Sequence, residues 1–242
     1  LLADEGRWKD IIALLDANTR RTAALTVEHG YGGQRALLEA ASENAVGDAR
    51  YYSGGGASAA LPHYRRAIAL LDRADARHPP DVRRQIRRVI YHYQLGTTLQ
   101  ELGRDDDALA TFDRGQELGR NLLAIEDGPA ASRAVSAVAL AHAKLLSQRG
   151  RHEEAVRMAT AVTDARRALI DRDPADFDLS VSYLASLRPL AEILVAGRRQ
   201  REACDIAQRA RAGWAALARR SPLPQMIRTG DLPTLEAMLR AC

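Results

Sequence analysis

The sequence predicts an all-α chain of stacked helical hairpins, and a recurring glycine is the main reason. Successive copies stand 49, 48, 47 and 47 residues apart, each before an alanine- and arginine-rich helical pattern: Gly6, Gly55, Gly103, Gly150 and Gly197. A fixed period of about 20 to 50 residues is typical of a solenoid, whose units bury their apolar faces only by stacking. Composition agrees, because 46% hydrophobic residues with only 5% aromatic ones suit many close helix contacts. No alternating β-branched run indicates a strand.

Prolines mark the far ends of the predicted hairpins. Pro79-Pro80, Pro129, Pro174 and Pro222 each push the preceding residue out of the helical conformation. We therefore expect helices of roughly 20 residues, close to 30 Å long. Their expected ranges are 8–28, 34–53, 57–77, 81–102, 105–126, 130–149, 152–172, 175–196, 199–220 and 232–241. We expect one repeat domain over 1–242, with units of about 1–30, 31–79, 80–128, 129–173 and 174–221 and a capping helix at 231–242.

The residues around Gly103 give the repeat its detailed form. Leu95-Gly96 precedes the turn Leu102-Gly103-Arg104, and small or aromatic residues follow at helical spacing: Ala108, Phe112 and Gly115. This pattern resembles a tetratricopeptide repeat (TPR), in which small residues let paired helices approach closely. The other units repeat it, with a one-residue slip at Gly197 and a looser first unit. The resemblance implies a right-handed superhelix of about ten antiparallel helices, with a period about 13 residues longer than the usual 34.

Other stretches resemble one particular group of such arrays. They are Asp173-Pro174 with Asp178–Tyr183, Leu61–Ala67, and a tail that holds Ala203-Cys204, Trp214, Ser221-Pro222-Leu223 and Cys242. These stretches resemble the TPR-like arrays, with units of about 48 residues, found C-terminal to bacterial serine/threonine protein kinases. The resemblance implies a non-catalytic interaction or sensor module in bacterial signalling. A membrane helix often precedes the array in that family, which would place this chain outside the cytoplasm, in the periplasm; otherwise a cytoplasmic location is expected.

The chain itself carries no kinase motif, neither a glycine-rich loop nor His-Arg-Asp nor Asp-Phe-Gly. We therefore expect no enzyme activity from this segment, although the full-length parent would be a kinase. The alternative is a TPR effector or regulatory domain of a DNA-binding transcriptional regulator. Because the chain begins at Leu1 and its first unit lacks a first helix, we expect it to be a piece of a longer protein. No apolar run approaches about 18 residues, so no transmembrane span is expected.

Several local features have simpler explanations than a chemical site. Gly54–Gly56 lacks the lysine and the preceding strand of a phosphate-binding loop, so it is interpreted as a turn. Asp105–Asp107 suits the positive end of a helix dipole. The six histidines show no metal-ligand spacing. We expect no catalytic residue, no metal and no cofactor.

The charge pattern permits an anionic partner without requiring one. The net charge is +4 and the sequence pI about 9.3. Arginines cluster along two predicted helices: Arg65, Arg66, Arg73, Arg77, Arg83, Arg84, Arg87 and Arg88. No aromatic platform or recognition motif accompanies them, so we interpret the cluster as a solvated helix face. An acidic peptide or protein is the alternative partner, and a nucleic-acid partner is not expected.

The TPR resemblance also implies a ligand-binding face, formed by the first helix of each hairpin. The expected residues are Tyr93, Thr97, Gln100, Leu140, Lys144, Gln148, Arg188 and Glu192. This mixed polar set lacks the paired lysines and asparagines of a clamp for terminal carboxylates. The partner we expect is an unidentified protein or peptide, and self-association through the terminal repeats stays open. The alternative is that these are ordinary solvated side chains.

The two cysteines lie on helices that are expected to pack antiparallel. Cys204 and Cys242 could meet if the descending loop absorbs a length mismatch between the two helices. An oxidising compartment, as the kinase resemblance implies, would then allow a disulfide. The alternative is two unpaired thiols, with Cys204 packed as a small apolar residue and Cys242 frayed at the terminus.

Overall fold

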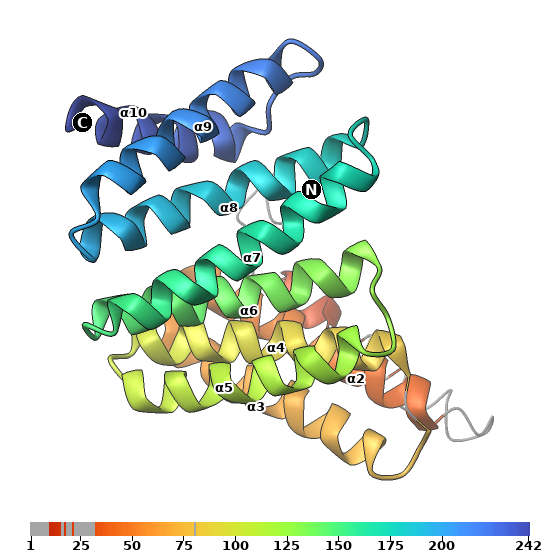
Figure 1. Ribbon diagram of the computed structural model, residues 1–242. Helices are drawn as coiled ribbons and strands as arrows, with labels where there is room; N and C mark the ends of the chain where they lie inside the picture. Colours follow the sequence, from red (N-terminus) through yellow and green to blue (C-terminus); the bar gives the residue numbers. More distant parts are fainter. Residues whose placement is uncertain (1–9, 16, 18–20, 22–31, 80) are drawn as a thin grey trace. The chain divides into compact units, whose positions relative to one another are not determined.

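All regular secondary structure in the described part of the chain is helical. The computed structural model describes residues 10–15, 17, 21, 32–79 and 81–242. Its elements are α2 (Gly32–Arg50), η1 (Tyr51–Gly55), α3 (Gly56–Asp75), α4 (Val82–Glu101), α5 (Asp105–Leu123), α6 (Pro129–Gln148), α7 (His152–Arg172), α8 (Phe177–Ala196), α9 (Gln200–Ala218), η2 (Ile227–Asp231) and α10 (Leu232–Arg240) (Figure 1). The expected helix ends agree within a few residues from 34 onward. The expected helix 8–28 and unit 1–30 lie largely outside the described residues.

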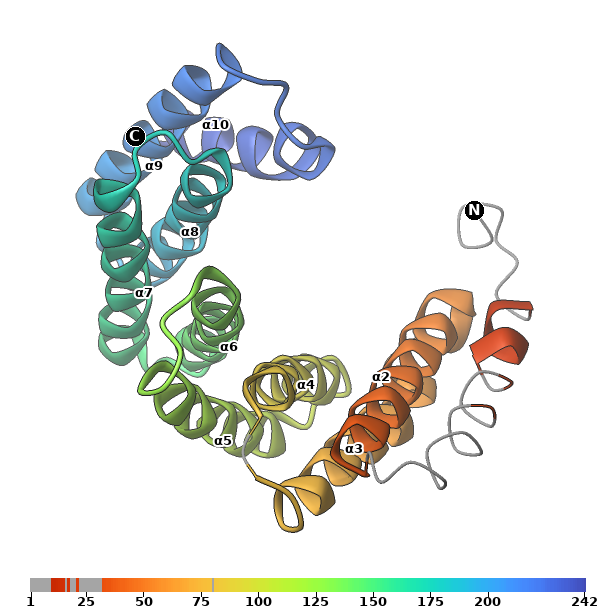
Figure 2. The same cartoon turned by 90° about the vertical axis from the view of Figure 1, so that its right-hand side faces the viewer.

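The chain divides into two compact units, Leu1–Val138 and Ala139–Cys242. In the first unit α2 pairs with α3 and α4 with α5. The helices α2 and α4 lie on one side of it, and α3 and α5 on the other (Figure 2). In the second unit α8 packs against both α7 and α9, and α10 packs against α9. The division falls inside α6, and a single domain over 1–242 stays a prediction.

A left-handed residue recurs at the turn inside three hairpins. Gly103 has φ 71° and Gly150 has φ 80°, whereas the third turn uses Arg198, with φ 60°. In each turn the next residue donates its backbone N–H to a leucine carbonyl five residues earlier, at 2.8–2.9 Å. The one-residue slip at Gly197 therefore moves the left-handed position from a glycine onto an arginine.

This slip predicts a stabilising substitution. Arg198→Gly is expected to raise the free energy of unfolding by about 1 kcal/mol, because a side chain at positive φ is strained and glycine is not. Urea denaturation measures the change. Arg198→Ala is the control and should show no such gain, since it keeps a Cβ. A glycine variant no more stable than the alanine variant would contradict the strain argument.

Paired residues of complementary size join the two helices of each hairpin. A Cβ added to Gly96 on α4 would come within 2.3 Å of the Phe112 ring on α5, and one added to Gly47 on α2 would come within 2.7 Å of Tyr64 on α3. The later hairpins carry alanine at both corresponding positions, Ala143 with Ala159 and Ala191 with Ala207, and all four are fully buried. The first two described hairpins therefore pack an aromatic ring against a glycine at these positions, whereas the later hairpins have two alanine methyl groups there.

The interpretation of the arginine cluster as a solvated face was wrong for two of its eight members, Arg84 and Arg88, whereas the other six are exposed. Arg84 is buried and its guanidinium lies 2.8 Å from the Asp75 carboxylate. Arg88 lies 2.8 Å from Asp75 and 2.6 Å from Asp72, both on α3. Spacing along one helix did not reveal these pairs because the carboxylates come from the end of the preceding helix.

The core of the second unit forms around Trp214 of α9. It includes Leu187 of α8, Ile227 of η2 and Leu235 of α10. Among the described helices, α8 is the one long and apolar enough to cross a membrane by length and composition, which the sequence analysis did not anticipate. Much of α8 is buried in this core. Its apolar character is therefore that of a core helix, and it is weak evidence for a membrane span.

Candidate functional site

The α2 and α4 side of the first unit is the candidate binding face. Tyr93, Thr97 and Gln100 lie along α4 and are all half-exposed. Matching Gly47 to Gly96, the two glycines that face an aromatic ring, places Asn44 and Asp48 of α2 at the repeat positions of Tyr93 and Thr97. These two residues were not predicted, because Gly55 and Gly103 are 48 residues apart, whereas Gly47 and Gly96 are 49 apart, and the turn glycines therefore give a register shifted by one residue. The aromatic partner of Gly47 was the signal that could have found them.

Asp48 is the centre of a polar cluster that draws on three helices. Its carboxylate accepts a hydrogen bond from the Tyr64 hydroxyl of α3 at 2.6 Å. It also accepts from the Asn44 amide at 3.2 Å and, more weakly, from the Gln94 amide of α4 at 3.4 Å. Burial raises the pKa of Asp48, and the hydrogen bond from Tyr64 offsets part of that effect.

Three buried polar atoms in this region have no hydrogen-bond partner among the described residues. They are Asn44 Oδ1, Gln94 Oε1 and the Tyr91 hydroxyl. Tyr91 is 1% exposed, and burial, more than the charge of Asp48, raises its pKa to about 12 against the opposing effect of Arg87. Buried polar groups in folded proteins are nearly always satisfied by protein, water or ligand atoms, so these three atoms around one carboxylate mark a place where water or a ligand supplies the contacts.

Two adjacent tyrosines border the cluster at the end of α2. The Tyr51 hydroxyl donates to Glu101 of α4 at 2.8 Å. Tyr52 is 67% exposed and stacks edge-on against Tyr51 at 5.1 Å. We call the whole set the α2–α4 face; it consists of Asn44, Asp48, Tyr51, Tyr52, Tyr91, Tyr93, Gln94, Thr97, Gln100 and Glu101. The face has four tyrosines, three amides and two carboxylates, and it contains no lysine or arginine.

The raised pKa of Asp48 predicts how stability depends on pH. A carboxyl group with a higher pKa in the folded chain binds more protons there, so stability falls as pH rises from the ordinary value of 3.8 through the folded pKa. Asp48→Asn is expected to remove this loss and to be more stable than the wild type at neutral pH. Urea unfolding of both proteins from acid to neutral pH measures the difference. A variant that loses stability relative to the wild type as pH rises would contradict the prediction.

The predicted residues in the second unit have different surroundings. Leu140 on α6 is half-exposed, and Lys144 and Gln148 are exposed. Arg188 on α8 lies 2.5 Å from Glu192 and 2.8 Å from Asp231 of η2. Arg188 thus joins η2 to α8 through Asp231, a contact across 43 residues that repeat spacing could not indicate, and Glu192 contacts Arg188. Whether any of these residues meets a ligand stays a prediction.

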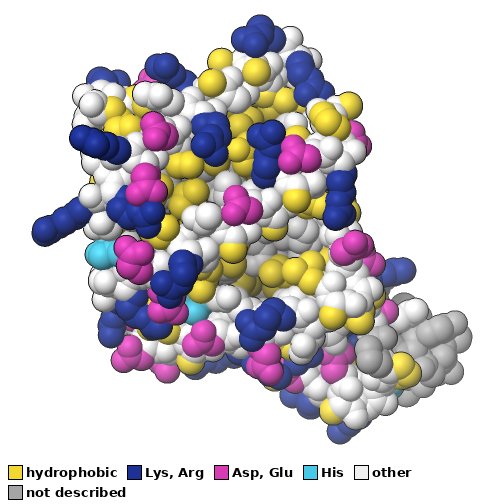
Figure 3. Space-filling view, in the orientation of Figure 1, with side chains coloured by type: hydrophobic (Ala, Val, Ile, Leu, Met, Phe, Trp, Pro, Cys, Tyr) yellow, Lys and Arg dark blue, Asp and Glu magenta, His cyan; other side chains and the backbone are white. Residues whose placement is uncertain are grey.

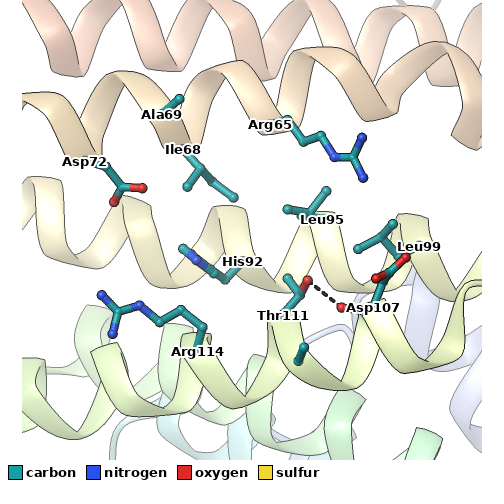
Figure 4. Close-up of a pocket in the computed structure, with 11 residues that line it drawn as sticks. Arg65, Ile68, Ala69, Asp72, His92, Leu95, Leu99, Asp107, Thr111 and Arg114 are labelled. Atoms are coloured by element: carbon teal, nitrogen blue, oxygen red, sulfur yellow. Dashed lines mark hydrogen bonds between the residues drawn. The ribbon is translucent and has the colours of Figure 1, made fainter.

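A groove of about 400 Å³ lies on the opposite side of the first unit, between α3 and α5 over α4 (Figure 4). Its floor is apolar, with Ile68, Leu95 and Leu99. Three of its four charged rim residues already have partners within the chain: Asp72 with Arg88, Asp107 with Arg104 and Arg114 with Glu117. His92 donates a hydrogen bond from Nδ1 to the Arg88 carbonyl at 2.8 Å, and burial lowers the pKa of His92. These groups are satisfied, so the groove is the weaker candidate.

Metal and nucleic-acid binding gain no support from the described residues. No three His, Cys, Asp or Glu side chains among them gather as a metal site. The face seen in Figure 3 mixes basic and acidic side chains with apolar ones between them, and no extended patch of one charge gathers on it. A phosphate backbone is bound by a concentrated basic surface, which this face does not offer.

Similar proteins are found by structure and not by sequence. No protein-family model matches the chain, and no curated protein matches its sequence. A Podosopora anserina protein described as a putative kinesin light chain with nearly identical TPR-like repeats has a TM-score of 0.59 at 17% identity, with 92% of each chain covered. A substituted form of that protein has a TM-score of 0.62 at 18% identity, covering 91% of this chain and 92% of that one. BtubC from P. vanneervenii has a TM-score of 0.66 at 13% identity, covering 97% and 89%.

These likenesses confirm the predicted all-α, TPR-like fold. At such low identity they concern the fold alone. None of the three descriptions mentions a kinase or a transcriptional regulator. The kinase resemblance therefore rests on the sequence stretches that suggested it.

Proposed function

We propose that this chain is a non-catalytic protein-interaction module that binds a peptide segment of a partner protein on the α2–α4 face. The observation that carries the proposal is the group of unpartnered buried polar atoms around Asp48, on the helices that lie on one side of the first unit. Tyrosine is enriched at binding surfaces because it offers a large apolar ring with a polar end at low entropic cost. A TPR-like fold with such a face is well suited to hold an extended or helical peptide.

The proposal extends to the parent protein. We place the module in the C-terminal region of a bacterial serine/threonine kinase, outside the cytoplasm, and its support is the sequence resemblance together with the disulfide described below. A TPR effector domain of a DNA-binding regulator is the alternative. The sequence of the parent upstream of this segment distinguishes them, because a kinase domain and a DNA-binding domain have different motifs.

Panning a random-peptide phage library against the full chain tests the binding proposal. Selected peptides should lose affinity about tenfold or more with Thr97→Arg, which places a bulky cation on the α2–α4 face. Thr111→Arg is the matched control, since it makes the same change at a half-exposed threonine of α5 beside the opposite groove. Failure to select any peptide, or peptides that bind the Thr97→Arg variant as well as the wild type, would overturn the proposal.

A further inference from the structure

We infer that the α2–α4 face recognises a basic side chain, a lysine or arginine of the partner, through Asn44, Asp48 and Gln94. The inference rests on the proposed function and adds the chemistry of the ligand. It follows from the hydrogen-bond roles of these three side chains, from the charge of the face and from its tyrosines.

The hydrogen-bond roles of the two amides around Asp48 leave two acceptor oxygens for a ligand, and the Tyr91 hydroxyl, the third unpartnered group, can donate or accept. An ionised carboxylate cannot donate, so Asn44 and Gln94 must both turn their NH₂ groups toward it. Their amide oxygens are then fixed as the unpartnered atoms, Asn44 Oδ1 and Gln94 Oε1. A group that satisfies them must donate hydrogen bonds. Ammonium and guanidinium groups carry three and five N–H donors and no acceptor, whereas a carboxylate or phosphate carries acceptors only.

The charge of the face favours the same ligand. Asp48 forms no ion pair with any described residue, and Glu101 has only the Tyr51 hydroxyl as its hydrogen-bond partner among them. The remaining members of the face are uncharged. Burial and the Tyr64 hydroxyl, and no cation, set the shift in the pKa of Asp48, whereas Arg87, one helical turn from Tyr91, acts on the Tyr91 hydroxyl. A ligand cation therefore supplies the counter-charge that Asp48 lacks, and burial strengthens the attraction.

The surroundings also suit a long basic side chain. Asn44, Asp48 and Gln94 each keep part of their surface exposed, so the cluster lies within reach of a ligand from solvent. The rings of Tyr51, Tyr52 and Tyr93, which keep exposed surface, offer apolar surface to a methylene stem, and their π-faces attract cations. An acidic peptide would instead place like charges beside Asp48 and Glu101.

The test uses small probes on the full, isotope-labelled chain. Nα-acetyl-lysinamide and Nα-acetyl-argininamide are titrated while the side-chain NH₂ signals of Asn44 and Gln94 are followed by NMR. Both probes should shift these signals saturably, and Nα-acetyl-norleucinamide, which lacks the cation, should not. Asp48→Asn should weaken probe binding about tenfold or more. Glu117→Gln is the matched control because it removes an exposed carboxylate of α5 and should leave binding unchanged.

The outcomes separate this inference from the proposed function. The inference is overturned if the probes leave the wild-type signals unmoved, as expected if the cluster only holds buried water. It is also overturned if the probes bind Asp48→Asn as well as they bind the wild type. Panned peptides that depend on Thr97 but carry no lysine or arginine also overturn it, and they leave the proposed function standing. Saturable binding of the two cationic probes with no peptide selected supports the inference about the site and overturns the peptide-binding function.

Discussion

Phe112→Ala is expected to lower the free energy of unfolding by about 3–5 kcal/mol. The Phe112 ring is 0% exposed and lies over Gly96, where the absence of a side chain lets α4 and α5 approach. Removing the ring leaves a cavity that two closely packed helices cannot fill by collapse. Because the chain has two compact units, unfolding is followed by urea denaturation with hydrogen exchange to assign the loss to the first unit.

The companion substitution Gly96→Ala is expected to cost about 1–3 kcal/mol, because its Cβ would stand 2.3 Å from the Phe112 ring. The double variant places alanine at both positions, as in the pairs Ala143 with Ala159 and Ala191 with Ala207. It should therefore lose clearly less stability than the two single losses added together, with a coupling of about 1–3 kcal/mol. Strictly additive losses would show that the ring and the glycine do not depend on each other.

Ala143→Gly is the control for this cycle. It changes the corresponding residue of α6, where the partner Ala159 is already small. Only helix propensity and one methyl group are lost, so the expected cost is about 1 kcal/mol. A loss of stability as large as that of Phe112→Ala would contradict the view that the ring-over-glycine pair of one hairpin corresponds to the alanine pairs of the later hairpins.

The helix ends were predictable because local chemistry determines them. Glycine supplies the positive φ at Gly103 and Gly150, and the prolines at 79, 129, 174 and 222 lie between hairpins or at a helix start, although Pro62 and Pro189 lie inside α3 and α8. The turn predicted at Gly54–Gly56 is present at the end of η1, where Gly54 has φ 99° and the backbone leaves the helical conformation. The π-helical segment η2 was not predicted, because a shift of backbone hydrogen bonds by one residue is not recorded in side-chain periodicity.

The candidate site was only half predictable for a different reason. Tyr93 and Thr97 follow from repeat positions on α4, but the cluster depends on Asp48, Tyr64 and Gln94 meeting from three helices. The partners of a polar side chain are set by packing between repeats. The same holds for Arg188 and Asp231, which are 43 residues apart and pair because η2 folds back onto α8.

Replacing both cysteines by alanine is expected to destabilise the second unit by up to about 4 kcal/mol. In the structure Cys204 and Cys242 form a disulfide, with their Cα atoms 5.9 Å apart and a sequence separation of 38. The bridge fastens the end of the chain to the start of α9 and so limits the freedom of the unfolded loop. Urea denaturation of the oxidised wild type and the double variant measures the loss.

Hydrogen exchange should locate the effect of this change. Without the bridge α10 is held by the packing of Leu235 and by the pair between Arg188 and Asp231, so its amides should exchange faster while those of α8 stay protected. Each single cysteine variant should lose as much stability as the double variant, because either one breaks the bridge.

Thiol titration of the denatured, unreduced protein provides the independent measurement. No free thiol is expected in material made under oxidising conditions. Two free thiols would contradict the bridge, and they would also remove the structural support for placing this module outside the cytoplasm, since disulfides persist mainly in oxidising compartments.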